Sequence, residues 1–242
     1  MKKTLAVVIL ALAMPLAAWA DDGAPPPCIE ATLEYYMELE GGCTIGDKIF
    51  SDFQYNNVVS GGALSQPASS IWVTPDSTPL NPGLTFQGGW GATAAGQTSD
   101  ILIGFVVTVM PGGGAIEDAS LSIPGSTAGG GGSVIAGETI WLNCPGPCEP
   151  SVQLEAWNFP GTENDQLSDH VTFDPVMMVT VEKDILLTAG DCTFDNPCEI
   201  SFATASIINQ NFSEVPEPAT LTLLGTGLVG LGGLIRRRKK SK

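Results

Sequence analysis

The fold is decided by the stretch Ile101-Leu102-Ile103-Gly104-Phe105-Val106-Val107-Thr108-Val109. It is almost continuously apolar and rich in β-branched residues, which is typical of a strand buried on both faces. Nine residues are too few to cross a membrane as a helix. We therefore predict that residues 101–110 form a central strand of a β-sheet.

Segments of similar character lie on both sides of this stretch. Each is rich in Val, Ile, Phe, Thr or Trp, and most are bounded by Gly, Pro, Asn or Asp. The predicted strands are 48–55, 70–74, 84–90, 116–123, 133–143, 151–159, 171–188 in two pieces, and 199–208. Many short strands with such boundaries indicate an all-β sandwich or barrel. We predict one jelly-roll-like β-sandwich domain at residues 21–213, with loops at 112–114 and 129–132.

One segment departs from the strand pattern. Residues 31–40 place Leu33, Tyr36, Met37 and Glu40 at helical spacing, ahead of two glycines. This spacing predicts a short N-terminal helix.

The first twenty residues differ in chemistry from the interior. Lys2 and Lys3 precede an apolar run at residues 5–14, and Ala18-Trp19-Ala20 follows as a small-x-small pattern. This order predicts a signal peptide at residues 1–20, cleaved between Ala20 and Asp21. The alternative is an N-terminal membrane helix that is retained.

The C-terminal end combines three features in order. Val215-Pro216-Glu217-Pro218 precedes an uncharged, glycine-rich run at residues 219–235, and a basic cluster follows: Arg236, Arg237, Arg238, Lys239 and Lys240. Seventeen helical residues extend roughly 25 Å, which is at the short end of what spans a bilayer. The cations predict a cytoplasmic end, so the preceding residues face outward. An ordinary single-pass anchor is the alternative.

This C-terminal segment, residues 214–242, resembles the PEP-CTERM sorting signal of exported bacterial proteins. The resemblance implies that an exosortase, a membrane cysteine protease, recognises Pro216, Glu217 and Pro218. It further implies anchoring in the inner membrane during transit, followed by delivery to the cell surface or extracellular matrix. Stretches such as Gly42-Cys43-Thr44-Ile45-Gly46-Asp47 also resemble segments of exported PEP-CTERM proteins of similar length, which supports one domain over about residues 27–212.

The charge of the exported part is one-sided. Setting aside Lys2, Lys3 and the six cations after Ile235 leaves Lys48 and Lys183 against 26 acids, a formal charge of −24. Such a chain lacks the cationic contacts that nucleic acid requires, so we expect no nucleic-acid partner. The acids form a solvated surface or, alternatively, bind calcium weakly.

Six cysteines in an exported chain predict disulfide bonds. Proximity in sequence favours three pairs, and Cys144-Pro145-Gly146-Pro147-Cys148 reads as a tight turn. A zinc site is the rival hypothesis, disfavoured by the spacing and by an oxidising compartment. The predicted pairs are Cys28–Cys43, Cys144–Cys148 and Cys192–Cys198.

Catalytic patterns are hard to find. His170 is the only histidine, and no nucleophile elbow, zinc motif or phosphate loop occurs. We expect a protein that is not an enzyme, although paired carboxylates leave glycosidase chemistry open. Candidate cation ligands are Glu163, Asp165 and Asp169 in one loop, and Asp191, Asp195 and Glu199 near the third cysteine pair.

Four tryptophans allow two interpretations: a platform for stacking sugars, or filling of the sandwich core. They are Trp72, Trp90, Trp141 and Trp157. The sequence therefore supports an exported structural or interaction protein of the cell surface or exopolysaccharide matrix. The alternative is a secreted carbohydrate- or calcium-binding β-sandwich module.

Overall fold

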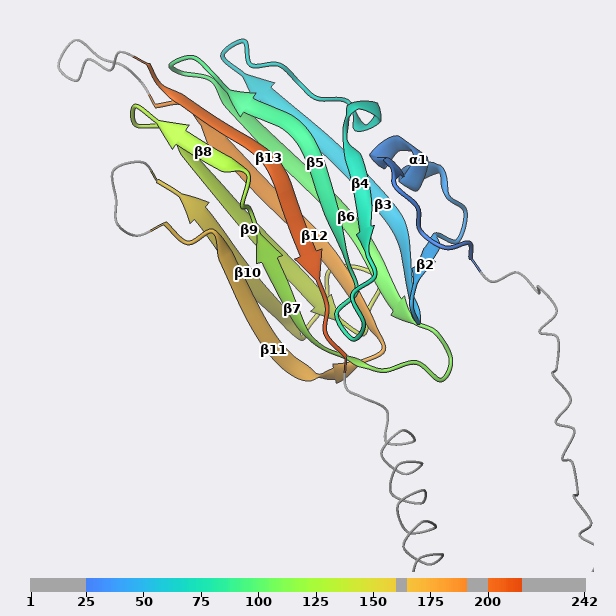
Figure 1. Ribbon diagram of the computed structural model, residues 1–242. Coiled ribbons are helices and arrows are strands. Elements are labelled where there is room, and N and C mark those ends of the chain that lie inside the picture. Colours follow the sequence, from blue (N-terminus) through green and yellow to red (C-terminus); the bar gives the residue numbers. More distant parts are fainter. Residues whose placement is uncertain (1–24, 160–164, 191–199, 215–242) are drawn as a thin grey trace, which may run out of the picture.

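The computed structural model describes residues 25–159, 165–190 and 200–214. Two antiparallel β-sheets lie face to face, with one short helix at an edge (Figure 1). The chain is thus an all-β sandwich, as predicted. The signal peptide and the helix predicted at 219–235 lie outside the described residues. Within the described part, no helix is long and apolar enough to cross a membrane.

The six-stranded sheet contains the stretch that decides the fold. Its strand order is β10 (Ser151–Asn158), β9 (Ser133–Leu142), β12 (Met178–Thr188), β6 (Thr98–Val109), β3 (Lys48–Ser60) and β2 (Cys43–Ile45). β6 lies between β12 and β3, so the predicted central strand is confirmed. Its near-continuous apolar sequence fits this position because both of its edges are paired.

The seven-stranded sheet carries the last strand of the domain at its centre. Its order is β1 (Ala31–Thr32), β4 (Trp72–Asp76), β5 (Gly83–Ala92), β13 (Phe202–Asn211), β7 (Ile116–Ser122) and β11 (Ser168–Val176), and β8 (Ser126–Gly129) also pairs with β13. β13 pairs with three other strands of this sheet, namely β5, β7 and β8. It therefore joins the two halves of this sheet.

The helix α1 (Leu33–Glu38) is shorter than the predicted 31–40. Ala31 and Thr32 pair with β4 instead, and the Thr32 hydroxyl caps the helix by accepting a hydrogen bond from the Tyr35 N–H at 3.4 Å. Leu33 and Tyr36 are buried, so the helix covers one end of the core. A one-turn 3₁₀ helix, Ala68–Ser70, precedes β4.

Aromatic rings join the two sheets in the core. Phe105 of β6 stacks on Phe53 with ring centroids 5.5 Å apart, and it also contacts Phe50. From the opposite sheet, Phe86 lies 6.0 Å away and Phe212 lies 6.5 Å away. Phe105 is therefore the ring around which this part of the core packs.

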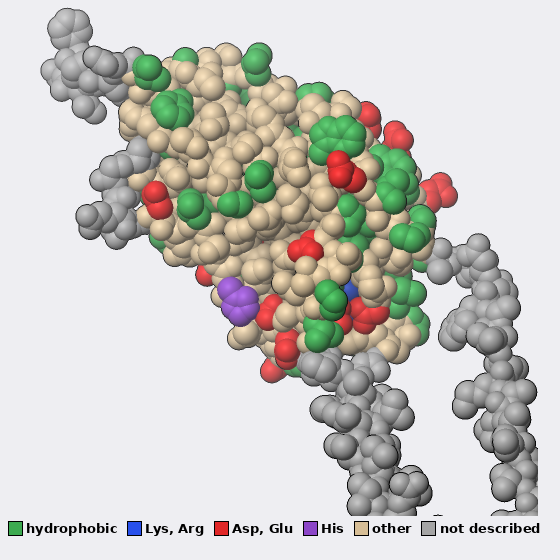
Figure 2. Space-filling model, in the orientation of Figure 1, with side chains coloured by type: hydrophobic (Ala, Val, Ile, Leu, Met, Phe, Trp, Pro, Cys, Tyr) green, Lys and Arg blue, Asp and Glu red, His purple; other side chains and the backbone are tan. Residues whose placement is uncertain are grey.

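Both lysines of the described residues are completely buried. Lys48 and Lys183 each have no exposed area. No Lys or Arg side chain is therefore exposed anywhere in residues 25–159, 165–190 and 200–214. Figure 2 agrees with this on the face it shows, where acidic side chains lie at the surface and almost no basic atoms are visible.

Two of the predicted disulfides are present. Cys28–Cys43 ties the segment before β1 to β2, and Cys144–Cys148 closes the loop between β9 and β10. Cys192 and Cys198 lie outside the described residues.

Candidate functional site

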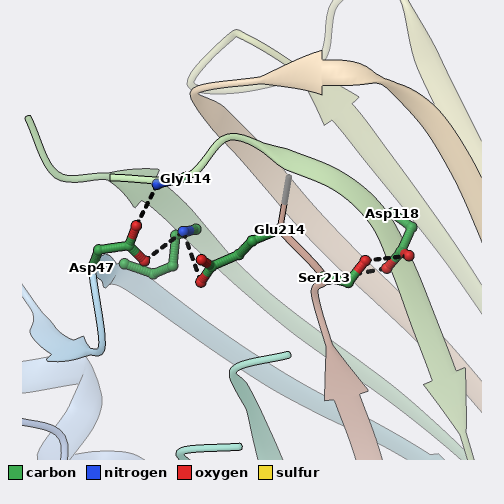
Figure 3. Close-up of polar contacts among 6 residues, drawn as sticks. Asp47, Gly114, Asp118, Ser213 and Glu214 are labelled. Atoms are coloured by element: carbon green, nitrogen blue, oxygen red, sulfur yellow. Dashed lines mark hydrogen bonds and ion pairs between the residues drawn. The ribbon is translucent and has the colours of Figure 1, made fainter. Parts of the chain in front are cut away.

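The described chain ends at an ion cluster built around Lys48, the first residue of β3. The Lys48 Nζ lies 2.6 Å from Asp47 Oδ1 and 3.0 Å from Glu214 Oε1. The Gly114 N–H donates to the other oxygen of Asp47 at 2.5 Å. Figure 3 shows Asp47 and Glu214 pointing toward each other beside the loop that carries Gly114. The cluster fastens the last described residue to the start of the third strand.

The two carboxylates of this cluster differ in electrostatics. Burial acts to raise the pKa of Asp47, but the hydrogen bond and charge of Lys48, with the Gly114 N–H, lower it overall. Burial raises the pKa of Glu214, and Lys48 only partly offsets this rise. Asp47 is therefore the stronger anionic partner of Lys48.

Backbone contacts hold the same segment next to Glu214. The Ser213 N–H donates to Asp118 Oδ1 at 3.0 Å, and the Ser213 hydroxyl also donates to Asp118 (Figure 3). The Glu117 N–H donates to the Ser213 carbonyl at 3.2 Å, and the Glu214 N–H donates to the Leu80 carbonyl at 3.2 Å. The chain is thus held in place up to residue 214.

A second feature is a groove of about 430 Å³ on the outer face of the six-stranded sheet. Gly104 of β6 lies opposite Glu182 of β12 and Gln54 of β3 in the strand register. Because Gly104 has no side chain, the sheet surface is hollowed there. A Cβ at this position would meet only ordinary contacts, the nearest at 3.6 Å.

One end of the groove carries an aromatic side chain and a braced loop. Trp141 of β9 lies opposite Thr180, and the Pro145–Pro147 turn lines the same space. The Thr180 hydroxyl donates to the Cys144 carbonyl at 2.6 Å, which fixes the disulfide loop over the sheet. The groove therefore combines a partly exposed indole with a rigid wall.

The other side of the groove is formed by a bulge in β3. The register with β6 shifts between Ser51 and Gln54, and Asp52 has a positive φ of 55°. Bulges re-aim side chains. Here Asp52 and Gln54 both line the groove and are exposed, while Phe53 points into the core.

Carboxylates continue along this outer face. Glu182 lines the groove, and Asp184 follows on the same face of β12 next to Asp100. Burial raises the pKa of Asp184, and the neighbouring Asp100 and Glu182 raise it further. The carboxylate, amide and hydroxyl side chains in and beside the groove can accept hydrogen bonds, whereas the Trp141 indole only donates. No cation neutralises these carboxylates in the described residues.

Of the predicted cation ligands, the structure describes only Asp165 and Asp169. Asp165 accepts a hydrogen bond from the Phe159 N–H at 2.8 Å, and Asp169 accepts one from the Glu155 N–H at 2.9 Å. In residues 25–159, 165–190 and 200–214, no group of three or more His, Cys, Asp or Glu side chains could hold a metal ion. Glu163, Asp191, Asp195 and Glu199 lie outside the described residues.

The tryptophans serve different roles, so neither interpretation holds for all of them. Trp90 is buried, and its indole N–H donates to the Tyr55 hydroxyl at 3.1 Å. Trp72 is half exposed on the other sheet, and Trp141 and Trp157 are partly exposed. No single platform gathers all four, and Trp141 alone among them lines the groove.

His170 is exposed and lies on β11. Its Nε2 is 3.2 Å from Asp118 Oδ2, the same carboxylate that holds Ser213. It thus belongs to the surroundings of the C-terminal junction. No sequence pattern indicated that His170 lies beside Asp118, because the strands that carry them, β11 and β7, are far apart in the chain.

Comparison with known proteins matches the C-terminal segment. The model of the PEP-CTERM protein-sorting motif matches residues 214–239. This motif marks an exported protein that an exosortase processes at the membrane. Glu214 of the ion cluster is the first matched residue, while Pro216, Glu217, Pro218 and the basic residues Arg236–Lys240 lie outside the described residues. No curated protein matches the chain.

Two solved structures resemble the sandwich distantly. One is TmCBM61 in complex with beta-1,4-galactotriose, at 9% identity and a TM-score of 0.29, covering 66% of this chain and 88% of that chain. The other comes from work on the promiscuous specificity of carbohydrate-binding modules of the β-sandwich superfamily, at 12% identity and a TM-score of 0.22. It covers 76% of this chain and 62% of that chain.

Proposed function

We propose that this chain is a non-enzymatic structural or interaction protein that an exosortase sorts to the cell surface or exopolysaccharide matrix. The observation that carries the proposal is the match of residues 214–239 to the PEP-CTERM protein-sorting motif, whose first residue, Glu214, is fastened to Lys48. Only Val215 separates this held residue from Pro216. In this proposal the acidic domain is the part that is delivered, and the sorting motif directs where it is delivered.

The short connection has a consequence for presentation. An exosortase acting at Pro216, Glu217 and Pro218 meets a chain that emerges directly from the folded sandwich. The uncharged segment 219–235 and the cations Arg236–Lys240 hold the chain in the inner membrane meanwhile. The sandwich therefore stays close to the membrane until it is processed.

Replacing Pro216, Glu217 and Pro218 together by alanine tests the sorting step. We expect the variant to remain in the inner-membrane fraction, whereas the parent protein reaches the surface or medium. Fractionation and immunoblotting of cells with and without the exosortase measure this difference. Leu64→Ala, at an exposed loop position outside residues 214–239, serves as the control. Equal retention of the parent protein in both strains would contradict the proposal.

A second candidate function is carbohydrate binding at the outer-face groove. The observation that favours it is the partly exposed Trp141 beside a hollow formed at Gly104. The apolar face of a sugar ring packs against an indole, and hydroxyl groups donate to carboxylate and amide oxygens such as those of Asp52, Glu182 and Gln54. The absence of lysine and arginine from the groove favours a neutral glycan over an acidic one.

Two variants separate binding in the groove from binding elsewhere. Trp141→Ala removes the stacking face, and Gly104→Val fills the hollow without entering the core. Both should weaken binding of a glycan found by array screening about tenfold or more, a loss of about 1.4 kcal/mol, in calorimetry. Trp72→Ala, on the opposite sheet, should leave the affinity unchanged. Calorimetry with calcium chloride in parallel tests the calcium-binding alternative.

A further inference from the structure

Three polar side chains meet in the interior between the two sheets. Glu138 comes from β9, Lys183 from β12 and Gln210 from β13, and all three have at most 3% exposed area. The Lys183 Nζ donates to Glu138 Oε2 and to Gln210 Oε1. The lysine thus contacts a carboxylate in its own sheet and a carboxamide in the opposite sheet.

The surroundings of this group are apolar. In the strand register Lys183 lies opposite Glu138 and Ile103, and Gln210 lies opposite Leu84 and Leu121. Those three apolar neighbours are all buried. Water is therefore excluded from the contact between the amine and the carboxamide.

A purely structural role leaves this arrangement poorly explained. Replacing a buried ion pair with apolar side chains is often neutral or stabilising, so the pair adds little stability as such. The second oxygen of Glu138, Oε1, has no hydrogen-bond partner among the described residues, although it is buried. An unpaired buried carboxyl oxygen normally costs stability. A chemical role would account for keeping an amine, a carboxamide and a carboxyl group together.

We propose that Lys183 and Gln210 join in an intramolecular isopeptide bond that links the two sheets, with Glu138 as the proton carrier. The uncharged Nζ of Lys183 attacks the Cδ of Gln210, forming a C–N bond. Glu138 in its acid form protonates the carboxamide oxygen during attack. It then takes a proton from Nζ and delivers one to the departing nitrogen, and the proton on the carboxamide oxygen returns to Glu138 as the carbonyl re-forms. The old C–N bond breaks and one ammonia molecule leaves, so a primary amine and a primary amide become a secondary amide plus ammonia.

The protonation states in the core suit this chemistry. Burial lowers the pKa of Lys183, against the opposing effect of Glu138, and burial raises the pKa of Glu138, against that of Lys183. Both shifts favour the neutral amine and the neutral acid over the ion pair. A neutral amine is the nucleophilic form, and a neutral carboxylic acid is the form that donates a proton. No oxidant, cofactor or other protein is needed.

The bond would lie on the path between the domain and its anchor. β13 carries Gln210 and runs on to Glu214, where the sorting motif begins. β12 lies inside the six-stranded sheet, between β9 and β6. A covalent link between these strands prevents the last strand from being pulled out of the sandwich through the chain that follows it.

Digestion of the denatured full chain tests the bond directly. Between Lys3 and Arg236, trypsin has only Lys48 and Lys183 as cleavage sites. We purify the full chain in detergent, reduce and denature it, and analyse tryptic peptides by mass spectrometry. The bond predicts cleavage after Lys48 but not after Lys183. It also predicts one peptide, residues 49–236, that is lighter than its sequence mass by one ammonia. Complete cleavage after Lys183, with no loss of ammonia, overturns the proposal.

Three variants assign the roles. Gln210→Met keeps the core volume but removes the carboxamide, so cleavage after Lys183 should return in full. Glu138→Gln keeps the shape of the side chain but removes the acid, so the bond should fail to form in a protein that still gives the strand signal in circular dichroism. Lys48→Met removes the other buried lysine and should leave the bond intact. A cross-linked Glu138→Gln protein overturns the role of Glu138. Loss of one water, with Lys183 joined to the segment holding Glu138, overturns the assignment of Gln210.

Discussion

Replacing Phe105 with alanine should lower the free energy of unfolding by about 3–5 kcal/mol, the usual loss for a large aromatic side chain in a well-packed core. The ring contacts Phe50 and Phe53 in its own sheet and Phe86 and Phe212 beyond it. Its removal leaves a cavity that no single neighbour can fill. Urea titration followed by circular dichroism measures the change. Since a domain of this size is stable by only about 5–15 kcal/mol, the variant should be partly unfolded at elevated temperature.

Thr108→Ala on the same strand is the matched control. Thr108 is only partly buried and lies on the outer face of β6, so its loss should change the unfolding free energy by less than about 1 kcal/mol. Equal effects of the two substitutions would show that Phe105 does not organise the core.

Replacing Lys48 with methionine should lower the free energy of unfolding at neutral pH by an amount near the lower end of the range of about 3–5 kcal/mol. The substitution leaves Asp47 and Glu214 close together without their cation. The Asp47 and Glu214 side chains are 30% and 11% exposed. Solvent therefore screens part of the repulsion between them and reduces the loss of stability. Chemical denaturation of both proteins at pH 7 measures the loss.

The pH dependence of this loss follows from the carboxylates. In the parent protein the lowered pKa of Asp47 gives stability above its unfolded pKa of 3.8, which is lost as the pH falls through the folded value. The raised pKa of Glu214 acts in the opposite sense, since its contribution is present below 4.5 and is lost as the pH rises through the folded value. Without Lys48, burial still acts to raise the folded pKa of both carboxyl groups. The deficit in unfolding free energy relative to the parent protein should therefore become smaller as the pH falls.

A triple variant gives the control for this reasoning. Lys48→Met combined with Asp47→Asn and Glu214→Gln removes every charge of the cluster, so its stability should recover relative to Lys48→Met alone at pH 7. A Lys48→Met protein whose deficit is the same at pH 4 and pH 7 would argue against charge as the cause.

The strands were largely predictable because each carries its own local pattern. The continuous apolar run of β6 identified an inner strand, and the boundaries of β7, β9 and β10 are close to the predicted ones. β3 runs to Ser60, five residues beyond the predicted end, because residues 56–60 read Asn-Asn-Val-Val-Ser and carry no alternating pattern. β8 was missed, since Ser126–Gly129 leads into a glycine cluster and is stabilised by pairing with the distant β13.

The charged interior was not predicted, although a signal for it exists in the sequence. Lys183 is in phase with Val181 and Ile185, so strict alternation places it on the core face. Glu138 is likewise in phase with Ala136 and Ile140. Neither pattern identifies a partner, because β9, β12 and β13 come together only through the stacking of the sheets. The groove could not be predicted from the sequence for the same reason. Trp141, Gly104 and Asp52 belong to three strands that come together only in the folded sheet.

The central place of β13 constrains how this protein acquires its shape during export. Until β13 arrives, β5 and β7 have no shared neighbour, so the larger sheet remains in two separate halves. Synthesis and translocation deliver the chain from its N-terminus, and β13 is the last strand of the domain to emerge. The sandwich can close only once residues up to 211 are available to complete the larger sheet. A chain cut short before β13 could therefore not complete the sandwich, even if every strand of the six-stranded sheet had already formed.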